Sequence, residues 1–336
     1  MNKSQDPPLG LQGRFHSEAE KEPPVSGGHF KELLQASFKS SDTEEWLDVH
    51  FTRPIGLVFA LFWNKLGVHP NVITILSIFL GVGAGWMFHY TDLAHNIWGV
   101  ILLMFANFCD STDGQMARLT GKKTLIGRML DGFSGDVWFV AVYAAIAWRL
   151  WSEFIPFTDA QWGPWSWALC AVAGLMFHSP QSSLSDYYRQ IHLFFLKGKE
   201  GSELDNYAQQ RRVYEKYKQE GNVAGQLFFF NYANYCRSQE KRTPRFQRFF
   251  KQWQGTRNEE TRQQFLTGSR PLMPFTNILT FNTRAIVVYI SCLINQPWIY
   301  PVFEITIMQG LYVYMHSKHE ALCQSLYTPT DNDDNE

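Results

Sequence analysis

The sequence predicts an all-α integral membrane protein with six transmembrane helices. Two observations lead to this prediction. Several uncharged apolar runs approach the length of about 20 residues that a helix needs to cross a bilayer, and Lys and Arg are unevenly distributed among the connecting segments. The mean hydropathy of -0.22 averages these apolar runs with two polar blocks, 1–50 and 186–270. The net charge of -1 gives no bulk attraction to nucleic acid.

The six expected spans follow the uncharged runs in chain order. They are 71–90, 94–109, 137–148, 162–185, 285–303 and 305–316. The last two are separate spans if the chain turns at Asn295-Gln296-Pro297, since Asn and Pro are typical turn residues. Asp110 follows the second run, while Asp131 and Asp136 precede the third. Both of these helices are therefore expected to carry acidic residues at one end.

The distribution of Lys and Arg predicts the orientation. Three expected loops contain at most one such residue: 91–96, 149–163 and 293–298. The N-terminal block and the segments 114–128 and 186–270 are rich in them. Because short basic loops stay in the cytoplasm, the acidic helix ends and both termini are expected on the cytoplasmic side of the cell (inner) membrane.

The segments outside the spans have predicted roles of their own. The expected organisation is a polar, partly disordered N-terminus (1–44), an interfacial amphipathic helix (45–68), transmembrane helices 1–4 (69–185), a helical cytoplasmic insertion (186–272), transmembrane helices 5–6 (273–318) and a polar C-terminal tail (319–336). A seventh span at 45–68 is the competing interpretation, disfavoured by Pro54.

In the insertion, aromatic residues alternate with bases, a pattern that RNA binding can use. On a membrane protein, a helical hairpin resting on anionic headgroups is favoured instead, and no nucleic-acid partner is expected. The five cysteines lie far apart without a CxxC pair, so neither a disulfide framework nor a zinc site is predicted. The first thirty residues lack the apolar core of a cleaved signal peptide.

A cluster of aspartates predicts a metal site. Asp110 and Asp113 are three residues apart, so they share one helix face. Asp131, on the next, antiparallel helix, can meet them across a short loop. Carboxylates that converge in a low-dielectric cavity repel one another unless cations intervene. Because their ligand atoms are all oxygens, Mg²⁺, Mn²⁺ or Ca²⁺ is favoured over zinc.

Small residues and a base surround these aspartates. Gly114, Gly127 and Ala117 leave room for a nucleotide to approach the backbone closely. Arg118 lies one turn past Asp113 and can hold a phosphate oxygen.

The run that starts at Asp110 resembles the motif of the CDP-alcohol phosphotransferase family, D-x2-D-G-x2-A-R-x8-G-x3-D-x3-D, and matches it without a spacing error through Asp131. The Pro70-Asn71 dipeptide before the first span is also similar to family members. The resemblance implies six transmembrane helices, a cytoplasm-facing cavity, two Mg²⁺ or Mn²⁺ ions on the aspartates, CMP bound against the glycines and a homodimer. It also implies transfer of a phosphoalcohol group from a CDP-linked lipid to a small alcohol, with release of CMP.

The motif, the residues around it and the position of Arg284 at the end of the fifth span together give the expected site residues. The metal ligands are Asp110, Asp113, Asp131 and Asp136, and the nucleotide- and phosphate-binding residues are Asn71, Gly114, Ala117, Arg118, Gly127 and Arg284.

The chain departs from the motif at one position. Gly135 stands where the family has its fourth Asp, the group that deprotonates the acceptor hydroxyl, and the acid follows one place later at Asp136. In an ideal helix an i+4 residue lies about 40° from its reference and an i+5 residue about 140° away. Three explanations are open. A π-bulge between Gly132 and Gly135 can return Asp136 to the site as the base, another group can be the base, or the chain binds CDP-lipid without turnover.

Several further residues near the expected spans have roles that the sequence leaves open or does not define. Arg284, beside Asn282, is expected to bind phosphate or to anchor lipid headgroups. Lys122, Lys123 and Arg128 form either an ordinary basic loop or a site for an acceptor phosphate. Glu304 receives no role, and His178 is expected to be a packed core histidine.

The donor is expected to be CDP-diacylglycerol. The acceptor is expected to be inositol phosphate or another polyol or polyol phosphate, since Arg53-Pro54-Ile55 resembles members that use inositol phosphate. A CDP-choline- or CDP-ethanolamine-type aminoalcohol phosphotransferase acting on a diglyceride or ceramide is the alternative, and a non-catalytic lipid-binding protein is the alternative from another class.

Overall fold

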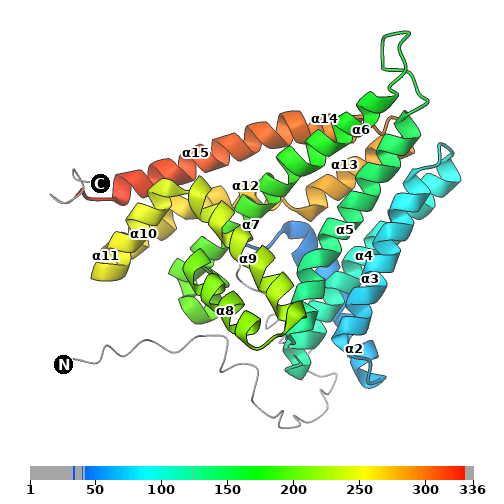
Figure 1. The fold of residues 1–336 in the computed structure, drawn as a ribbon. Helices are drawn as coiled ribbons and strands as arrows, with labels where there is room; N and C mark the ends of the chain where they lie inside the picture. The colour runs from blue at the N-terminus through cyan, green and yellow to red at the C-terminus, as the bar shows by residue number, and fades with distance from the viewer. Residues whose placement is uncertain (1–32, 35–39, 41, 123, 330–336) are drawn as a thin grey trace.

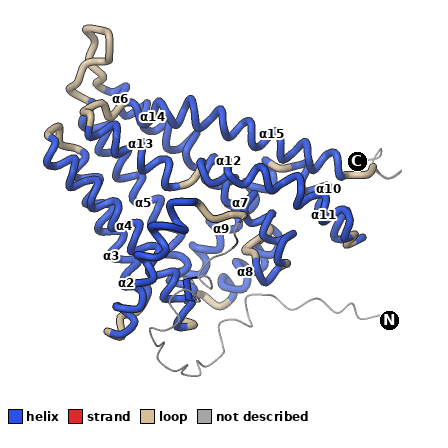
Figure 2. Tube along the Cα trace, turned by 180° about the vertical axis from the view of Figure 1, so that it is seen from behind, coloured by secondary structure: helices blue, strands red, loops and turns tan. Residues whose placement is uncertain are grey.

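The computed structural model describes residues 33–34, 40, 42–122 and 124–329, and these residues form helices and no strand (Figures 1 and 2). The elements of the first half are η2 (Asp48–Thr52), α2 (Arg53–Lys65), α3 (Pro70–Phe88), α4 (Leu93–Thr120), α5 (Leu125–Leu150), α6 (Pro164–Ala171), η3 (Val172–His178) and α7 (Ser179–Lys197). Those of the second half are η4 (Lys199–Gly201), α8 (Tyr207–Gln219), α9 (Val223–Arg242), α10 (Pro244–Thr256), α11 (Glu259–Ser269), η5 (Arg270–Leu272), α12 (Met273–Ile278), α13 (Phe281–Leu293), α14 (Ile299–Phe303), η6 (Glu304–Met308) and α15 (Gln309–Leu326).

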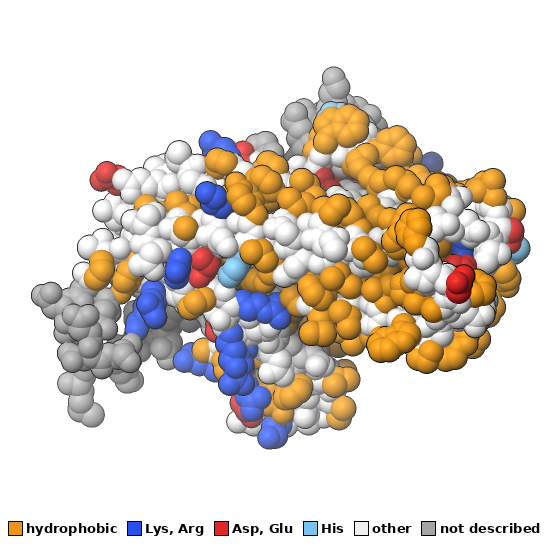
Figure 3. All heavy atoms as spheres, turned by 90° about the horizontal axis from the view of Figure 1, so that it is seen from above, with side chains coloured by type: hydrophobic (Ala, Val, Ile, Leu, Met, Phe, Trp, Pro, Cys, Tyr) orange, Lys and Arg blue, Asp and Glu red, His pale blue; other side chains and the backbone are white. Residues whose placement is uncertain are grey.

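Three of these helices are long and apolar enough to cross a membrane: Pro70–Phe88, Leu93–Thr120 and Met129–Leu150. They correspond to the first three expected spans, although α4 and α5 also contain the whole aspartate motif. The outer face of α3 is apolar, with Phe79 72% and Trp86 63% exposed, as expected for a lipid-facing helix. Figure 3 shows hydrophobic side chains crowded over the end of the molecule that holds α3–α6. The six-span topology stays a prediction.

Glycines allow α3 to lie very close to α5. A Cβ atom on Gly81 would lie 2.0 Å from Cδ1 of Trp138, and one on Gly85 would lie 2.8 Å from the backbone of Ala141. Small residues at helix crossings let backbones approach in this way, as is typical of helix pairs in membranes. The resulting contact fixes α5, and with it Asp131, against the rest of the molecule.

The remaining expected spans are built from interrupted helices. The fourth, 162–185, is α6, η3 and α7 in succession, and η3 is a π-helical turn. The fifth is α13, which ends at Leu293, and the turn expected at Asn295 is confirmed there by a φ of 59°. The chain therefore divides at this turn, and Glu304, which separates the uncharged runs 285–303 and 305–316, lies inside a continuous helical segment: α14, η6 and α15 run on without a loop, and η6 is another π-helical turn.

The expected interfacial helix consists of η2 and α2 and packs against α4. Thr112 Oγ1 donates to the carbonyl of Gly56 at 3.3 Å, and Gln115 Nε2 donates to the carbonyl of Arg53 at 3.1 Å. Its other face carries exposed apolar side chains, including Val58 at 56% and Phe62 at 52%. η2 and α2 run on without a break from Asp48 to Lys65, and this segment is not among the three helices that are long and apolar enough to cross a membrane. The choice between an interfacial helix and a seventh span at 45–68 stays a prediction.

The segment between the fourth and fifth expected spans is helical, as predicted, but its boundaries differ. α7 continues to Lys197, past the expected end of the span at 185, and α8 and α9 then form a hairpin. α10 and α11 pack against α15 and share a second hydrophobic core with it, which includes Phe246, Phe249 and Phe265. Half of the expected polar tail therefore belongs to this core, since α15 extends to Leu326. The N-terminus, 1–44, lies largely outside the described residues.

His319 is a neutral, buried imidazole in this second core, and its burial predicts how the stability of the protein depends on pH. It is 1% exposed, and its ring stacks on Tyr188 with centroids 4.0 Å apart. Burial, together with the charges of neighbouring His316 and His192, lowers the pKa of His319 from 6.5 to about 3. Between these two values the unfolded chain binds one proton more than the folded chain, so stability falls as the pH falls.

Because the unfolded chain takes up this proton, we expect the free energy of unfolding to fall by about 1.4 kcal/mol for each pH unit below pH 6.5. His319→Leu should reduce the pH dependence of stability between pH 6.5 and 5 by that amount. Unfolding measured at both pH values in detergent checks it, and an unchanged slope in the variant contradicts it.

Candidate functional site

The three aspartates of the motif come together as the sequence predicts. One carboxylate oxygen each from Asp110, Asp113 and Asp131 lies within 4.8 Å of the other two. Asp110 and Asp113 lie towards the C-terminal end of α4, and Asp131 lies near the start of α5. Because α4 and α5 are joined by the short segment after Thr120, their acidic ends lie side by side. A single cation can contact oxygens of all three carboxylates.

Two features of this group fit a bound divalent cation. Asp113 is 3% exposed, and its Oδ2 has no hydrogen-bond partner among the described residues. A buried carboxylate oxygen without a partner is costly, and a cation would satisfy it. The donors are carboxylate oxygens, which suit Mg²⁺ or Mn²⁺. The geometry therefore supports the predicted site for a hard divalent cation.

The sequence interpretation missed Ser134, which links two of these aspartates. Its hydroxyl lies 3.0 Å from Oδ1 of Asp110 and 2.8 Å from the carbonyl oxygen of Asp131, and the residue is 1% exposed. Such a partner fixes the orientation of a ligand carboxylate. Its position three residues after Asp131, on the same helix face, is a signal that could have identified it.

Asn71 and Gly127 also meet, at the start of α3 and α5. A Cβ atom on Gly127 would lie 2.7 Å from Oδ1 of Asn71, so only glycine fits beside this amide. Thr124 caps α5 by accepting a hydrogen bond from the Gly127 amide at 2.9 Å, and the Asn71 amide donates to the same hydroxyl at 3.4 Å. The Pro-Asn dipeptide thus joins the beginning of α3 to the beginning of α5.

Gly114, Ala117 and Arg118 follow the aspartates on α4. A Cβ atom on Gly114 would meet Nη1 of Arg118 at 3.5 Å, an ordinary contact, so the glycine is not required by packing alone. Arg118 is exposed, and its guanidinium is close enough to Asp113 and Asp131 for a Coulomb interaction. A phosphate held between the cation and Arg118 would be bound from both sides. Lys123 lies outside the described residues, as does the side chain of Arg128.

The expected π-bulge in α5 is absent. α5 is a regular α-helix from Leu125 to Leu150, and a Cβ atom on Gly132 or Gly135 would meet nothing within 4 Å. Asp136 is exposed and does not join the carboxylates of Asp110, Asp113 and Asp131. The prediction that a bulge returns Asp136 to the site is therefore wrong, because a regular helix turns an i+5 residue to another face.

Arg284 lies in a buried network rather than beside the aspartates. It is 1% exposed, its Nε donates to Oε1 of Glu304 at 2.7 Å, and its Nη2 donates to Oε1 of Gln181 at 3.1 Å. A further nitrogen donates to the carbonyl of Leu279. His178 lies 3.5 Å from the same Glu304 oxygen. Arg284 thus lies in a buried ion pair with Glu304, away from the three aspartates.

His178 belongs to this network and its side chain is 12% exposed, and its ring packs against Phe139, as predicted for a packed histidine. His178 and Glu304 each lie in a π-helical turn, His178 in η3 and Glu304 in η6. Asn282, grouped with Arg284 in the sequence, instead donates to Oε2 of Glu45 at 2.7 Å and to Oδ1 of Asp48 at 3.1 Å. It ties η2 to α13.

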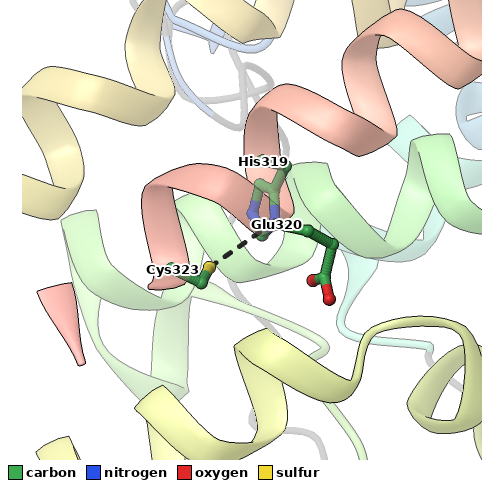
Figure 4. Close-up of side chains that lie close together, drawn as sticks. All are labelled: His319, Glu320 and Cys323. Atoms are coloured by element: carbon green, nitrogen blue, oxygen red, sulfur yellow. Dashed lines mark hydrogen bonds between the residues drawn. The ribbon is translucent and has the colours of Figure 1, made fainter. Parts of the chain in front are cut away.

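A second group of metal-ligating types is part of the packing. His319, Glu320 and Cys323 are each at most 5% exposed, and all lie on α15. Figure 4 shows His319 and Cys323 facing one another, with 3.7 Å between Nδ1 and Sγ, while the Glu320 carboxylate points away. That carboxylate accepts hydrogen bonds from the amides of Arg245 and Phe246 at the start of α10. It serves as a helix cap, so we assign no metal site to this group.

Fold and site together define the class: an α-helical protein with three helices able to cross a membrane and a carboxylate site suited to a divalent cation. Residues 67–180 match the family model described as CDP-alcohol phosphatidyltransferase, and the chain carries a domain of this family. The match includes α3 to α6 and all three site aspartates.

Among curated proteins, the chain is similar to two that are named phosphatidylinositol phosphate synthase. The one from Corynebacterium glutamicum is 34% identical over 108 residues, 31% of this chain and 48% of that protein. The one from Streptomyces avermitilis is 35% identical over 97 residues, 29% of this chain and 38% of that protein. An archaetidylinositol phosphate synthase from Pyrococcus horikoshii is 36% identical over 67 residues, 20% and 34% of the two chains. The chain thus spans a third to a half of the length of these relatives. No solved structure matches.

Proposed function

We propose that this chain transfers a phosphatidyl group from CDP-diacylglycerol to the hydroxyl of a polyol phosphate and releases CMP. The observation that supports this most directly is the convergence of Asp110, Asp113 and Asp131 within 4.8 Å, inside the region that matches the CDP-alcohol phosphatidyltransferase family. In this reaction the acceptor oxygen bonds to the β-phosphorus, the bond from that phosphorus to the bridging oxygen breaks, and CMP leaves with that oxygen.

The residues of the site suit this reaction. Asp110, Asp113 and Asp131 would hold Mg²⁺ or Mn²⁺. When bound, such an ion neutralises the charge of the diphosphate and the negative charge that develops on the departing CMP. Ser134 orients Asp110, and Arg118 binds a phosphate oxygen from the exposed side. Gly114 and Ala117 leave space beside α4 for the nucleotide, with Asn71 and Gly127 at the adjoining helix starts.

Inositol phosphate is the acceptor that we propose. The relatives named phosphatidylinositol phosphate synthase and archaetidylinositol phosphate synthase support this choice. Nothing in the site specifically favours an aminoalcohol donor. We further propose that the aspartates face the cytoplasm and that the protein is a homodimer, as the basic segments and the family resemblance imply.

The acceptor proton needs a base, and Asp136 is our candidate because it is the carboxylate next to the missing motif position. Its exposure and its separation from the three ligands favour a second possibility, a family member that binds CDP-lipid without transferring it. Release of CMP by purified protein with Mn²⁺ and CDP-diacylglycerol, against inositol phosphate, glycerol phosphate, inositol and serine, separates the two. CMP that depends on one acceptor supports the transferase, and the absence of CMP with every acceptor contradicts it.

Exchanging the acid between positions 135 and 136 locates the base. We expect Asp136→Asn to lower kcat by about 10²- to 10⁴-fold, the usual effect of losing a general base. Gly135→Asp in that background should recover activity, because position 135 has open space and matches the family motif. Asp159→Asn, in an exposed loop, is the control. Full activity of Asp136→Asn would exclude Asp136 as the base. If the unchanged protein were inactive and activity appeared only after Gly135→Asp, the non-catalytic protein would be favoured.

A further inference from the structure

The outer face of α9 is apolar in its first half and cationic in its second half. Its first half exposes Val223, Leu227 and Phe230 at 75%, 65% and 45%. Its second half exposes Arg237 and Lys241. At 100° per residue these five positions fall within about 80° of arc, so they form one stripe. Half of the stripe is apolar and the other half is cationic.

The cationic half continues onto α10. Arg245, Arg248 and Lys251 are exposed there, while Phe246 and Phe249 of the same helix are buried in the second core. In the described part of the chain no ion pair involves any of these five exposed cations, and Arg237 lies over the ring of Tyr207, 5.4 Å from its centroid. The cations are thus available to an external anion.

Acidic residues do not offset these charges along α9. Glu240 is the acid of this helix, and its Oε1 accepts a hydrogen bond from the amide of Tyr207 at 2.8 Å. Figure 3 shows Lys and Arg side chains gathered on one side of the molecule, next to the hydrophobic surface. The cations of α9 therefore have no acid of their own helix to offset them.

The apolar side chains on the outer side of the first half of α9 are not covered by other described residues. Its inner side is already packed, since Phe229 and Ala233 are 4% and 2% exposed and Phe229 stacks on Tyr217 of α8 with centroids 5.2 Å apart. In water, the apolar residues on the outer side would therefore stay exposed to solvent, next to the row of cations. Apolar side chains flanked by Lys and Arg are the pattern of a helix that lies in a bilayer interface, where acyl chains cover the one and headgroup phosphates bind the other.

We propose that this stripe, Val223, Leu227, Phe230, Arg237 and Lys241 with Arg245, Arg248 and Lys251, docks α9 and α10 on an anionic phospholipid surface. The membrane itself is the partner. The hydroxyl of Tyr235, on the adjoining face of α9, is close enough to the carboxylate of Asp136 for a Coulomb interaction.

Hydrogen exchange of the full-length protein tests this docking. The amides of residues 222–242 are measured in nanodiscs of phosphatidylcholine alone and in nanodiscs that also contain phosphatidylglycerol. We expect slower exchange on the anionic discs and loss of the difference at high salt, because exposed charges are screened. Equal exchange on both kinds of disc would overturn the proposal.

Charge reversal supplies the matched variants. Arg237→Glu with Lys241→Glu should remove the anionic protection, at about fivefold for each cation lost. Lys216→Glu with Lys218→Glu, on α8, changes the net charge equally but lies off the stripe, and it should leave the protection intact. Leu227→Asp should weaken protection on both kinds of disc. Protection that depends on protein concentration would instead indicate a second copy of the chain, and protection that appears only with added RNA would indicate a nucleic-acid surface. Either result overturns the proposal.

Discussion

Asp113→Asn is expected to lower acceptor-dependent CMP release by at least about 10³-fold and to abolish stabilisation by Mn²⁺. Asp113 is 3% exposed and has a carboxylate oxygen without a partner among the described residues, so an amide cannot replace it as a charged ligand. Without metal, the same substitution should raise thermal stability, because it removes one of three mutually repelling carboxylates. Melting temperatures with and without Mn²⁺, beside CMP release, measure both effects.

The opposite signs of these two effects make the test specific. A substitution that merely damaged the fold would lower stability with or without metal. Asp159→Asn, at an exposed loop position, should change neither quantity. Retention of Mn²⁺-dependent stabilisation in Asp113→Asn would refute the three-carboxylate site, whatever happened to activity.

Arg284→Met is expected to destabilise the protein by about 3–5 kcal/mol, the usual cost of leaving one member of a buried ion pair without its partner. Glu304 is 0% exposed and already has one carboxylate oxygen without a hydrogen bond among the described residues. Removing Arg284 takes away the guanidinium partner of this charge and leaves it with His178, 3.5 Å away. Equilibrium unfolding in mixed micelles measures the loss.

A second variant identifies the cause. Arg284→Met combined with Glu304→Leu removes both charges and should recover most of the stability, because apolar replacements of a buried pair are often neutral or stabilising. Arg211→Met breaks the exposed pair with Glu215 on α8 and should cost less than about 1 kcal/mol. If Arg284→Met unfolded normally but lost activity alone, Arg284 would be a phosphate-binding residue after all.

Much of the site followed from sequence spacing. Residues three apart on a helix share a face, and a short connection brings the next helix back antiparallel, so the convergence of Asp110, Asp113 and Asp131 was predictable. The apolar runs likewise predicted α3, α4 and α5, since length and hydropathy are local properties. The contact between Asn71 and Gly127 was harder to predict from the sequence, because it depends on how the starts of two helices lie against each other.

Other features depended on neighbours that a linear sequence does not show. Arg284 at a helix end fits a phosphate ligand as well as a buried ion pair, and only the position of Glu304, twenty residues further on, distinguishes them. The same holds for Asp136, for which glycines permit a π-bulge without requiring one. Two of the three π-helical turns in the described residues contain His178 and Glu304, where two helices meet around a buried charge.

The sequence by itself determined the helical class, the first three membrane-length helices, the clustering of the three aspartates and the displaced fourth acid, because each rests on composition or on spacing within one or two helices. The tertiary structure decided which face of α5 Asp136 occupies, that Arg284 is enclosed by Glu304 and Gln181, that α15 belongs to a second core, and that α9 presents an unpaired stripe. Those outcomes depend on packing between segments distant in the chain, where burial and partner geometry set the energy of each polar group.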